Sequence, residues 1–321
     1  MKRFVPSCLA ALALLTGEAQ AQSSYPIKPV KIVVPVAAGG AVDTMARLYG
    51  AHMSKVTGRQ FLVENKPGGG NVLGIESVVQ SPADGHTILF VASAITLNQF
   101  AHKKLPYDVE RDLIPVTQVV SMANVLVSHP SLPVTTLAQY IALAKARPGQ
   151  INYASSGVGG VLHMSMELLK HMTKVDVLHV PYRGLGPGMQ DLLAGHVGSM
   201  MANAFAARPH ISSGKLRGLG VTSRERTLAL PDIPTFSEAA VKGYEVLNWF
   251  GIFVPTGTSQ AIVDRLHAEA AAMLFAPETK QRLASEGADP VASKPAEFKV
   301  FVKSELEKWA AVAKAANLQA N

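Results

Sequence analysis

Short runs of β-branched residues alternate with amphipathic helical patterns along most of this 321-residue chain. Between residues 42 and 53, apolar side chains recur at the spacing of one helix face, and the same spacing returns at 262–273 and 298–313. Alternation of this kind is typical of α/β proteins with mostly parallel sheets. The predicted strands are Lys31–Val34, Thr87–Ala92, Asn124–Val127, Ile151–Ala154, Val177–Val180, Val197–Met201, Leu216–Val221 and Phe250–Val254.

Two extended apolar segments, Asn124–Val127 and Trp249–Val254, are each followed by a proline-containing turn. A chain that crosses into a second domain and returns needs two such segments. The length also fits two domains of about 100–200 residues each. We therefore expect two α/β domains, with a single α/β barrel as the alternative.

The first residues are typical of a secretory signal peptide. A basic start at residues 2–3 precedes an apolar stretch at 9–15 and the small-x-small pattern at 19–21. The stretch is far shorter than the roughly 20 residues that span a bilayer. We predict that residues 1–21 are removed and that the mature chain reaches the periplasm. Cys8, the only cysteine, would leave with this segment, which excludes thiolate metal sites and cysteine nucleophiles.

Charge and histidine content exclude further classes of function. The 30 Lys and Arg residues outnumber the 23 acidic ones, but they are scattered singly, so we expect no nucleic-acid partner. The ten histidines form neither His-x-His nor His-Glu-x-x-His, and we expect no metal and no cofactor. His163 is the one histidine considered for the site, because it follows a glycine-rich turn; a structural histidine is the alternative.

The first glycine-rich turn lies between the strand at 31–34 and a helical pattern. The first amides of a helix have no partner inside the helix and carry partial positive charge, so small residues there let an anion approach closely. An ordinary strand-to-helix turn with Asp43 as a helix cap is the alternative. The candidate residues are Val36, Ala37, Ala38, Gly39, Gly40 and Asp43.

A second turn of this kind follows the strand predicted at 151–154 and adds hydroxyl groups. It is read either as an anion-binding turn or as a plain Ser/Gly turn. A serine nucleophile is a third possibility, although the Gly-x-Ser-x-Gly pattern of hydrolases is missing. The candidate residues are Ser155, Ser156, Gly157, Gly159, Gly160 and His163.

A third turn, at 181–188, carries Tyr182 and Arg183, and its arginine could hold a carboxylate or lie free in solvent. Ligands of open α/β sheets bind at the carboxyl ends of the strands, so the three turns are expected to surround one crevice. Trp249 and Phe250 either belong to the core or form a wall of that crevice.

Many segments, in order from residue 25 to the C-terminus, resemble the Bug-type extracytoplasmic solute-binding proteins of tripartite tricarboxylate transporters. The matching segments are Tyr25–Pro35 with Gly39, Gly40 and Asp43; Val63–Gly68; Pro82–Thr87; Leu105–Asp108; His129–Pro133; Asn152–Gly157; His179–Gly184; Gly214–Arg217; Leu230–Thr235; and Trp249–Gly251.

The resemblance implies a periplasmic-binding-protein (Venus flytrap) fold, in which two α/β domains joined by two crossover strands close on a ligand. It places residues 25–123 and 250–321 in domain 1 and residues 124–249 in domain 2. It further implies that a carboxylate is held by the turns at 36–40 and 155–160. Ser93 and Asn203 complete the predicted ligand-binding set.

Two departures from the family pattern concern the ligand. The family often reads Pro-Phe-x-Pro-Gly-Gly at the first turn, whereas this chain has Val36 and Ala38 in place of Phe and Pro, which predicts a wider wall. The family often has acidic residues where this chain has Ala202 and Gly198. Such a residue can meet the ammonium of an amino acid, so its absence favours a carboxylate without an amine and with an apolar or aromatic body.

The sequence thus predicts a monomeric periplasmic solute-binding protein rather than an enzyme. Its expected ligand is a small carboxylate, either a di- or tricarboxylate or an aromatic acid, and its expected partners are membrane transporter subunits. Two alternatives stay open: a ligand-sensing subunit of a signalling system, and a secreted hydrolase that uses Ser155 or Ser156.

Overall fold

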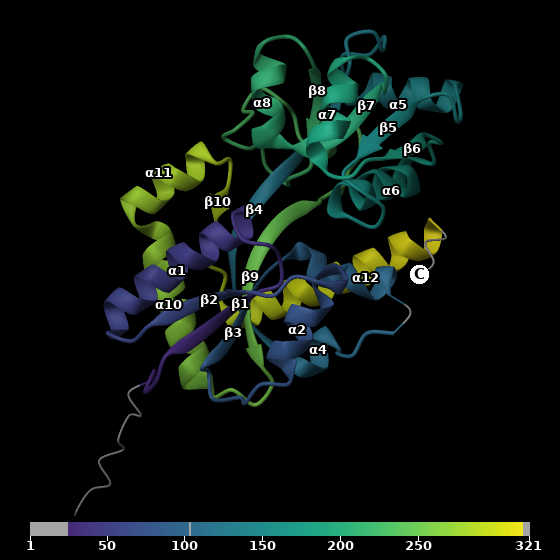
Figure 1. The fold of residues 1–321 in the computed structure, drawn as a ribbon. Coiled ribbons are helices and arrows are strands. Elements are labelled where there is room, and N and C mark those ends of the chain that lie inside the picture. Colours follow the sequence, from purple (N-terminus) through teal and green to yellow (C-terminus); the bar gives the residue numbers. More distant parts are fainter. Residues whose placement is uncertain (1–24, 103, 317–321) are drawn as a thin grey trace, which may run out of the picture.

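The computed structural model describes residues 25–102 and 104–316, which form two lobes with a β-sheet in each (Figure 1). The signal peptide predicted at residues 1–21 lies outside the described residues. Within the described part of the chain, no helix is both long enough and apolar enough to cross a bilayer.

The first sheet combines parallel and antiparallel strands. Its spatial order is β2 (Phe61–Asn65), β1 (Val30–Val34), β3 (Thr87–Ala92), β9 (Leu247–Pro255) and β4 (Leu113–Ser128), with β10 (Asp289–Pro290) on the outer edge of β4. Strands β2, β1 and β3 are parallel, whereas β9 is antiparallel to both of its neighbours. The apolar residues of β1 point to both faces, which buries the strand between two helical layers.

The helices of the first lobe are placed on the two faces of this sheet by their apolar stripes. They are α1 (Ala41–Thr57), α2 (Val72–Val79), α3 (Asn98–Ala101), α4 (Val109–Asp112), α10 (Gln260–Phe275), α11 (Pro277–Ser285) and α12 (Pro295–Ala315), with 3-10 turns at Gly69–Asn71 and Ser93–Thr96. Helices α1 and α10 cover one face, and α2 and the first half of α12 cover the other. Met45, Ala46, Tyr49 and Met53 of α1 are buried, as their spacing predicts.

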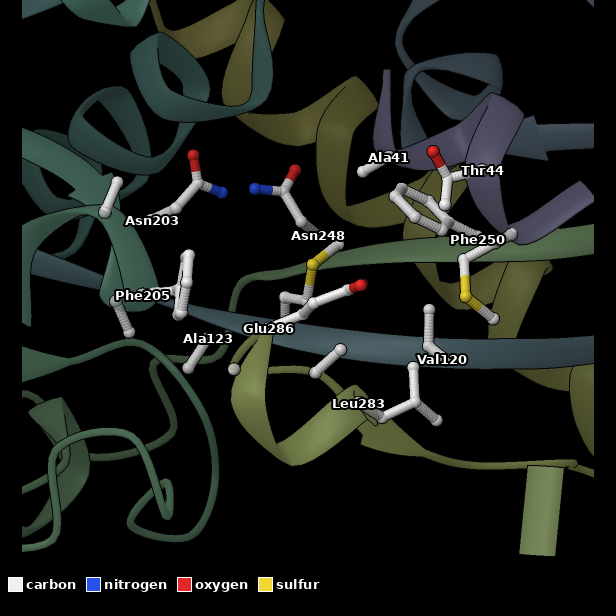
Figure 2. Close-up of a pocket in the computed structure, with 16 residues that line it drawn as sticks. Ala41, Thr44, Val120, Ala123, Asn203, Phe205, Asn248, Phe250, Leu283 and Glu286 are labelled. Atoms are coloured by element: carbon white, nitrogen blue, oxygen red, sulfur yellow. The ribbon is translucent and has the colours of Figure 1, made fainter. Parts of the chain in front are cut away.

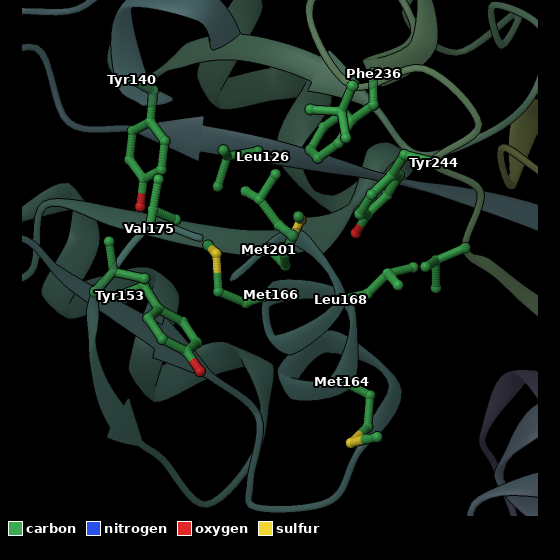
Figure 3. Packing of buried hydrophobic residues seen from close by; sticks show 14 of the residues in the cluster. Leu126, Tyr140, Tyr153, Met164, Met166, Leu168, Val175, Met201, Phe236 and Tyr244 are labelled. Atoms are coloured by element: carbon green, nitrogen blue, oxygen red, sulfur yellow. The ribbon is translucent and has the colours of Figure 1, made fainter. Parts of the chain in front are cut away.

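The second sheet is formed by the last five residues of β4 and four further strands. These are β7 (Ser199–Asn203), β5 (Asn152–Ser155) and β6 (Leu178–Pro181) in spatial order, with β8 (Arg217–Val221) on the other side of β4. Its helices are α5 (Leu137–Ala146), α6 (Val161–Thr173), α7 (Leu185–Leu193), α8 (Ala204–Ser212) and α9 (Phe236–Ala239). Figure 3 shows the core between this sheet and α5, α6 and α9, where Tyr140, Met166 and Phe236 are fully buried.

Strand β4 changes partners where it passes from one lobe to the other. Residues up to Ala123 pair with β9, and from Asn124 onward the strand pairs with β7 and β8. This change coincides with the expected boundary at 123/124, although the division into two separately folded domains stays a prediction. Trp249, assigned from the sequence to domain 2, pairs with Ser121 in the first sheet.

Helix α12 joins the lobes as a third connection that the sequence did not predict. Its first half buries Phe298 and Val302 in the first lobe, and its second half buries Trp309 and Val312 in the core of the second. Between them lies Glu305, which is 4% exposed and accepts hydrogen bonds from Trp309 Nε1 (3.1 Å) and Lys308 Nζ. The apolar stripe of α12 thus continues past the end of the first lobe, and the assignment of 250–321 to domain 1 stays a prediction.

Two of the strand segments that the sequence missed have a clear physical reason. In β2 only Phe61 is buried, since the strand lies at the sheet edge, so its apolar alternation is weak. The first half of β4 contains Pro115 beside a register shift, where proline is tolerated. The expectation of mostly parallel sheets holds for β1, β2, β3 and for β5, β6, β7. It fails for β4 and β9, because strands that leave and re-enter a lobe run in opposite directions.

We expect Trp309→Ala to lower the free energy of unfolding by about 3–5 kcal/mol, since it empties a buried indole site in the second-lobe core and removes a donor from Glu305. Urea unfolding at pH 7 measures this change. Val300→Ala, at a 71% exposed position of the same helix, is the matched control and should change stability by less than about 0.5 kcal/mol. A loss below about 1 kcal/mol for Trp309→Ala would show that the second half of α12 does not hold the second lobe.

Candidate ligand-binding site

A cavity of about 430 Å³ lies between the two lobes, where the paired strands β4 and β9 pass from one lobe to the other (Figure 2). The first lobe contributes the first turn of α1 and the turn that joins α11 to β10. The second lobe contributes the end of β7 and the first turn of α8. Residues of β4 and β9 complete the lining, so every wall of the cavity depends on how the lobes are joined.

The lobes touch at the rim of this cavity through Gly287 and Phe205. Gly287 has a φ angle of +64°, and a Cβ placed on it would lie 2.8 Å from the Cβ of Phe205. Both the backbone angle and the short distance therefore require glycine. The Phe205 side chain is 44% exposed, and the Arg208 guanidinium carbon lies 5.9 Å from its ring centre.

Two helices from opposite lobes begin at the cavity. Helix α1 starts with Ala41 after the N-cap Gly40, and α8 starts with Ala204 after the N-cap Asn203. Neither N-cap makes a side-chain hydrogen bond to its helix. Asparagine is a preferred capping residue, yet the Asn203 amide points into the cavity instead (Figure 2). The N-termini of both helices thus present their partial positive charge to the same cavity.

Three asparagines meet beside the crossover. The amide groups of Asn203 and Asn248 face each other in Figure 2, and Asn248 Nδ2 donates to Asn124 Oδ1 at 2.9 Å. Asn124 is fully buried in β4, and its Nδ2 has no hydrogen-bond partner among the described residues. Thr44 of α1, Asn203 and Asn248 supply the uncharged hydrogen-bonding side chains of the lining, and Asn124 is bonded to Asn248 without lining the cavity itself.

Asp43 is held inside the first lobe and does not line the cavity. Its carboxylate accepts hydrogen bonds from Gly39 N–H (2.9 Å), Arg47 Nε (3.0 Å) and Asn65 Nδ2 (2.9 Å). These donors, Arg47 first, lower the pKa of Asp43 to about 2. The Gly39 amide, predicted to be open to a ligand, is thus used within the chain, because Asp43 folds back over the start of its own helix.

The serine-rich turn at 155–160 does not line the cavity either. Gly157 N–H donates to Ser155 Oγ (3.2 Å), and Gly159 N–H donates to Nδ1 of His163 (3.1 Å). Two amides predicted to be open are therefore occupied. Whether Ser156 or Gly160 contacts a ligand stays a prediction.

Two stacked histidines lie under this turn. The rings of His163 and His179 are 4.1 Å apart, and His179 Nε2 lies 2.6 Å from Ser155 Oγ. Burial, with a smaller contribution from His163, lowers the pKa of His179 to about 4, and burial also lowers the pKa of His163. His163 is thus a structural residue here, and Glu167 Oε1 lies 3.8 Å from its Nε2.

A sequence model of the family described as "Tripartite tricarboxylate transporter family receptor" matches residues 45–318 of the chain. The match extends over most of both lobes. The chain belongs to this receptor family. Receptors of this family are extracytoplasmic, and they are solute-binding proteins rather than enzymes.

Known proteins similar to this receptor agree with that result. Protein BugT of Bordetella pertussis is 33% identical over 291 residues, which are 90% of this chain and 89% of BugT. The solved structure "R. palustris Rpa4515 with adipate" is 34% identical with a TM-score of 0.76 and covers 92% of this chain and 100% of its own. MatC from Rhodopseudomonas palustris with bound malate is 32% identical with a TM-score of 0.72, covering 90% and 99%. The predicted family and the periplasmic-binding-protein fold are confirmed.

Of the residues predicted from the receptor's sequence, Asn203 and Phe250 line the cavity. Helix α1 reaches it at Ala41, directly after the predicted turn at 36–40, whose last four residues are exposed. Asn203 was included only because of the family resemblance. The structure adds the reason, which is the position of this asparagine at the start of α8.

Several predicted residues lie away from the cavity lining. Ser93 is buried at the end of β3, where its carbonyl accepts a hydrogen bond from Thr96 Oγ1. Tyr182 donates to Asp191 at 2.6 Å, and Arg183 is exposed to solvent.

Trp249 belongs to the receptor's core. It is fully buried on the face of β9 opposite to Phe250, with its ring 5.5 Å from Phe298 and perpendicular to it. The prediction that Trp249 contacts the ligand is therefore corrected. The reason is the alternation of side chains along a strand, which sends neighbours to opposite faces.

Most of the side chains that line the cavity were not predicted from the sequence. These include Thr44, Met122, Phe205, Asn248, Leu283 and Glu286. Asn248 carried a usable signal, because it precedes the crossover residues already considered. Leu283 on α11 and Glu286 directly after it carried none, since they lie far along the chain from the other lining residues. Among the described residues, no group of three or more His, Asp or Glu side chains could hold a metal ion.

Replacing Asp43 by Asn should lower the receptor's free energy of unfolding at pH 7 by about 1.5–3 kcal/mol, because a carboxylate with three donors loses its charge. Since the folded-state pKa of Asp43 is depressed, this stabilisation exists above pH 4 and is lost as the pH falls toward 2. Between pH 7 and pH 3, the free energy of unfolding should therefore fall less in the variant than in the wild type. Urea unfolding at both pH values measures this difference. The control is Asp232→Asn, at an exposed position. An equal loss of stability in the control would contradict the stabilising role given to the hydrogen bonds of Asp43.

The buried histidine pair predicts a second pH dependence. Because the pKa of His179 is depressed to about 4, the unfolded chain binds more protons between pH 4 and 6.5, and stability should rise with pH across that window. His179→Gln should flatten this rise in urea unfolding measured at several pH values. His196→Gln, at a side chain that is 70% exposed, should retain the wild-type slope. Identical slopes in all three proteins would show that His179 does not titrate in this way.

Proposed function

We propose that this receptor, exported to the periplasm, captures a small carboxylate in the cavity between its lobes and delivers it to a membrane transporter of the tripartite tricarboxylate type. The observation that carries the proposal is the meeting of two helix starts, α1 and α8, from opposite lobes at one cavity. Two similar structures support the ligand class, since one was solved with adipate and the other with bound malate.

The binding energy comes from main-chain amides and uncharged side chains. A carboxylate at a helix start gains about 0.3–2 kcal/mol from the helix dipole. Each hydrogen bond to a charged group adds about 1.5–3 kcal/mol, and Thr44 and Asn203 are placed to donate such bonds. Several of these contacts reach about −8 kcal/mol, which corresponds to micromolar affinity. Without donors, burial of the carboxylate would be strongly unfavourable.

Capture by both lobes links binding to lobe closure. A ligand that contacts α1 and α8 together favours the arrangement in which the two helix starts are closest. The ligand shifts the lobes only as far as it binds that arrangement more tightly. The transporter subunits then recognise the ligand-bound form.

The hydrolase alternative finds no support at Ser155. Its hydroxyl lies 2.6 Å from His179 Nε2, but the residue is fully buried and does not line the cavity. The proteins of this family are receptors.

Thr44→Glu tests the position of the carboxylate. A glutamate in the first turns of α1 favours the helix, yet it puts a negative charge in the cavity lining. We expect at least a tenfold increase in the Kd for whichever carboxylate binds the wild type, measured by calorimetry with adipate, malate, hexanoate and benzoate. Val56→Glu, at the far end of α1, is the matched control and should bind as the wild type does.

The proposal fails if none of these acids binds, or if both variants bind as the wild type does. Delivery is tested in cells that lack the receptor, which should lose uptake of the acid that it binds. Restoration of uptake by the Val56→Glu variant but not by Thr44→Glu would connect the cavity to transport.

A further inference from the structure

On the basis of the proposed function, we infer that the receptor prefers a monocarboxylate with an uncharged, apolar far end over a dicarboxylate of the same length. The inference names the substrate class of the cavity, and it rests on how polar and apolar groups are distributed around it.

The cavity has a polar side and an apolar side. Figure 2 shows Asn203, Asn248 and Thr44 along one side, and Leu283 and Val120 along the other. Leu283 and Val120 are fully buried in the protein, so a ligand atom that reaches them leaves water. The ligand's carboxylate belongs with the amides and helix starts, and its body extends toward the apolar side.

The apolar side offers nothing to balance a second negative charge. Among the described residues that line the cavity there is no Lys, Arg or His. The one ionisable lining group is Glu286, an acid, whose Oε1 lies 3.0 Å from Arg282 Nε. Arg282 itself is not part of the lining. A second carboxylate would lose water against Leu283 and Met122 and would also face the Glu286 carboxylate.

The same groups rank three kinds of far end. A methyl group gains from burial against Leu283, Val120 and Met122. An ammonium gains attraction to Glu286 but loses hydration, and Arg282 already neutralises part of that charge. A carboxylate loses hydration and is repelled by Glu286. The expected order of affinity is therefore methyl, then ammonium, then carboxylate.

Three six-carbon acids isolate this effect, because they differ only at the far end: hexanoate, 6-aminohexanoate and adipate. Calorimetry at pH 7 with the mature receptor should give a Kd for hexanoate at least about tenfold below that for adipate, with 6-aminohexanoate between them. Adipate binding as tightly as hexanoate, or more tightly, overturns the inference. So does 6-aminohexanoate binding more tightly than hexanoate, which would identify Glu286 as an ammonium site.

Met122→Arg supplies the missing cation on the apolar side and should reverse the preference in favour of adipate. Val300→Arg adds the same side chain at a position 71% exposed on α12 and should retain the wild-type order. Glu286→Gln provides a second variant that is less prone to misfolding, because this side chain is 39% exposed. It should reduce the ratio of the adipate Kd to the hexanoate Kd at least threefold. If this Kd ratio is unchanged in both cavity variants, the inference is overturned.

The experiment separates the two proposals. If hexanoate, 6-aminohexanoate, adipate, malate and benzoate all fail to bind, the proposed function fails and the inference fails with it. If adipate or malate binds more tightly than hexanoate, the carboxylate function stands and the preference for an apolar far end alone is wrong.

Discussion

The antiparallel pairing of β4 with β9 is the constraint on which the rest of the structure depends. These two strands run between the lobes in opposite directions, and β4 changes its partners between Ala123 and Asn124. Because Ala123, Asn248 and Phe250 all line the cavity, the same backbone hydrogen bonds that join the lobes also position the site. A ligand bound there would contact β4 and β9, the strands that connect the lobes. Binding is thereby linked to the relative placement of the lobes.

Helix α12 adds a second constraint to this connection between the lobes. It packs Phe298 into the first lobe and Trp309 into the second, and Lys308 Nζ donates to the carbonyl of Glu245, which shortly precedes β9. Rotation of one lobe against the other would therefore disturb the packing of α12 in at least one of them. The Phe205–Gly287 contact at the cavity rim adds a further point at which the lobes meet.

The proposed site would bind a carboxylate without Lys, Arg or His among the described residues of its lining. The carboxylate of Asp43 in helix α1 is treated differently, since it accepts from the Gly39 amide and pairs with the Arg47 guanidinium, and Asp43 is not part of the lining. The chain thus satisfies one carboxylate internally and leaves the first turn of the helix facing the cavity. In the inference drawn above, specificity depends on the apolar side chains and Glu286 that would surround the far end of the ligand.

The sequence by itself determined the class of fold, because the alternation of β-branched runs with helical stripes, as at Met45, Tyr49 and Met53, follows from local side-chain geometry. It also located α1 and the crossover strands close to where the structure has them. Of the cavity lining, Phe250 was predicted from its place on a crossover strand, and Asn203 was predicted only from the family resemblance. Two of the amides predicted to be open are taken by local contacts over four residues, Gly39 by Asp43 and Gly159 by His163. For the first turn, this is close to the capping role of Asp43 that the sequence offered as the alternative. Tertiary structure alone brought Leu283 and Glu286 to the cavity, because residues far apart in the chain become neighbours only when the lobes pack around the crossing strands.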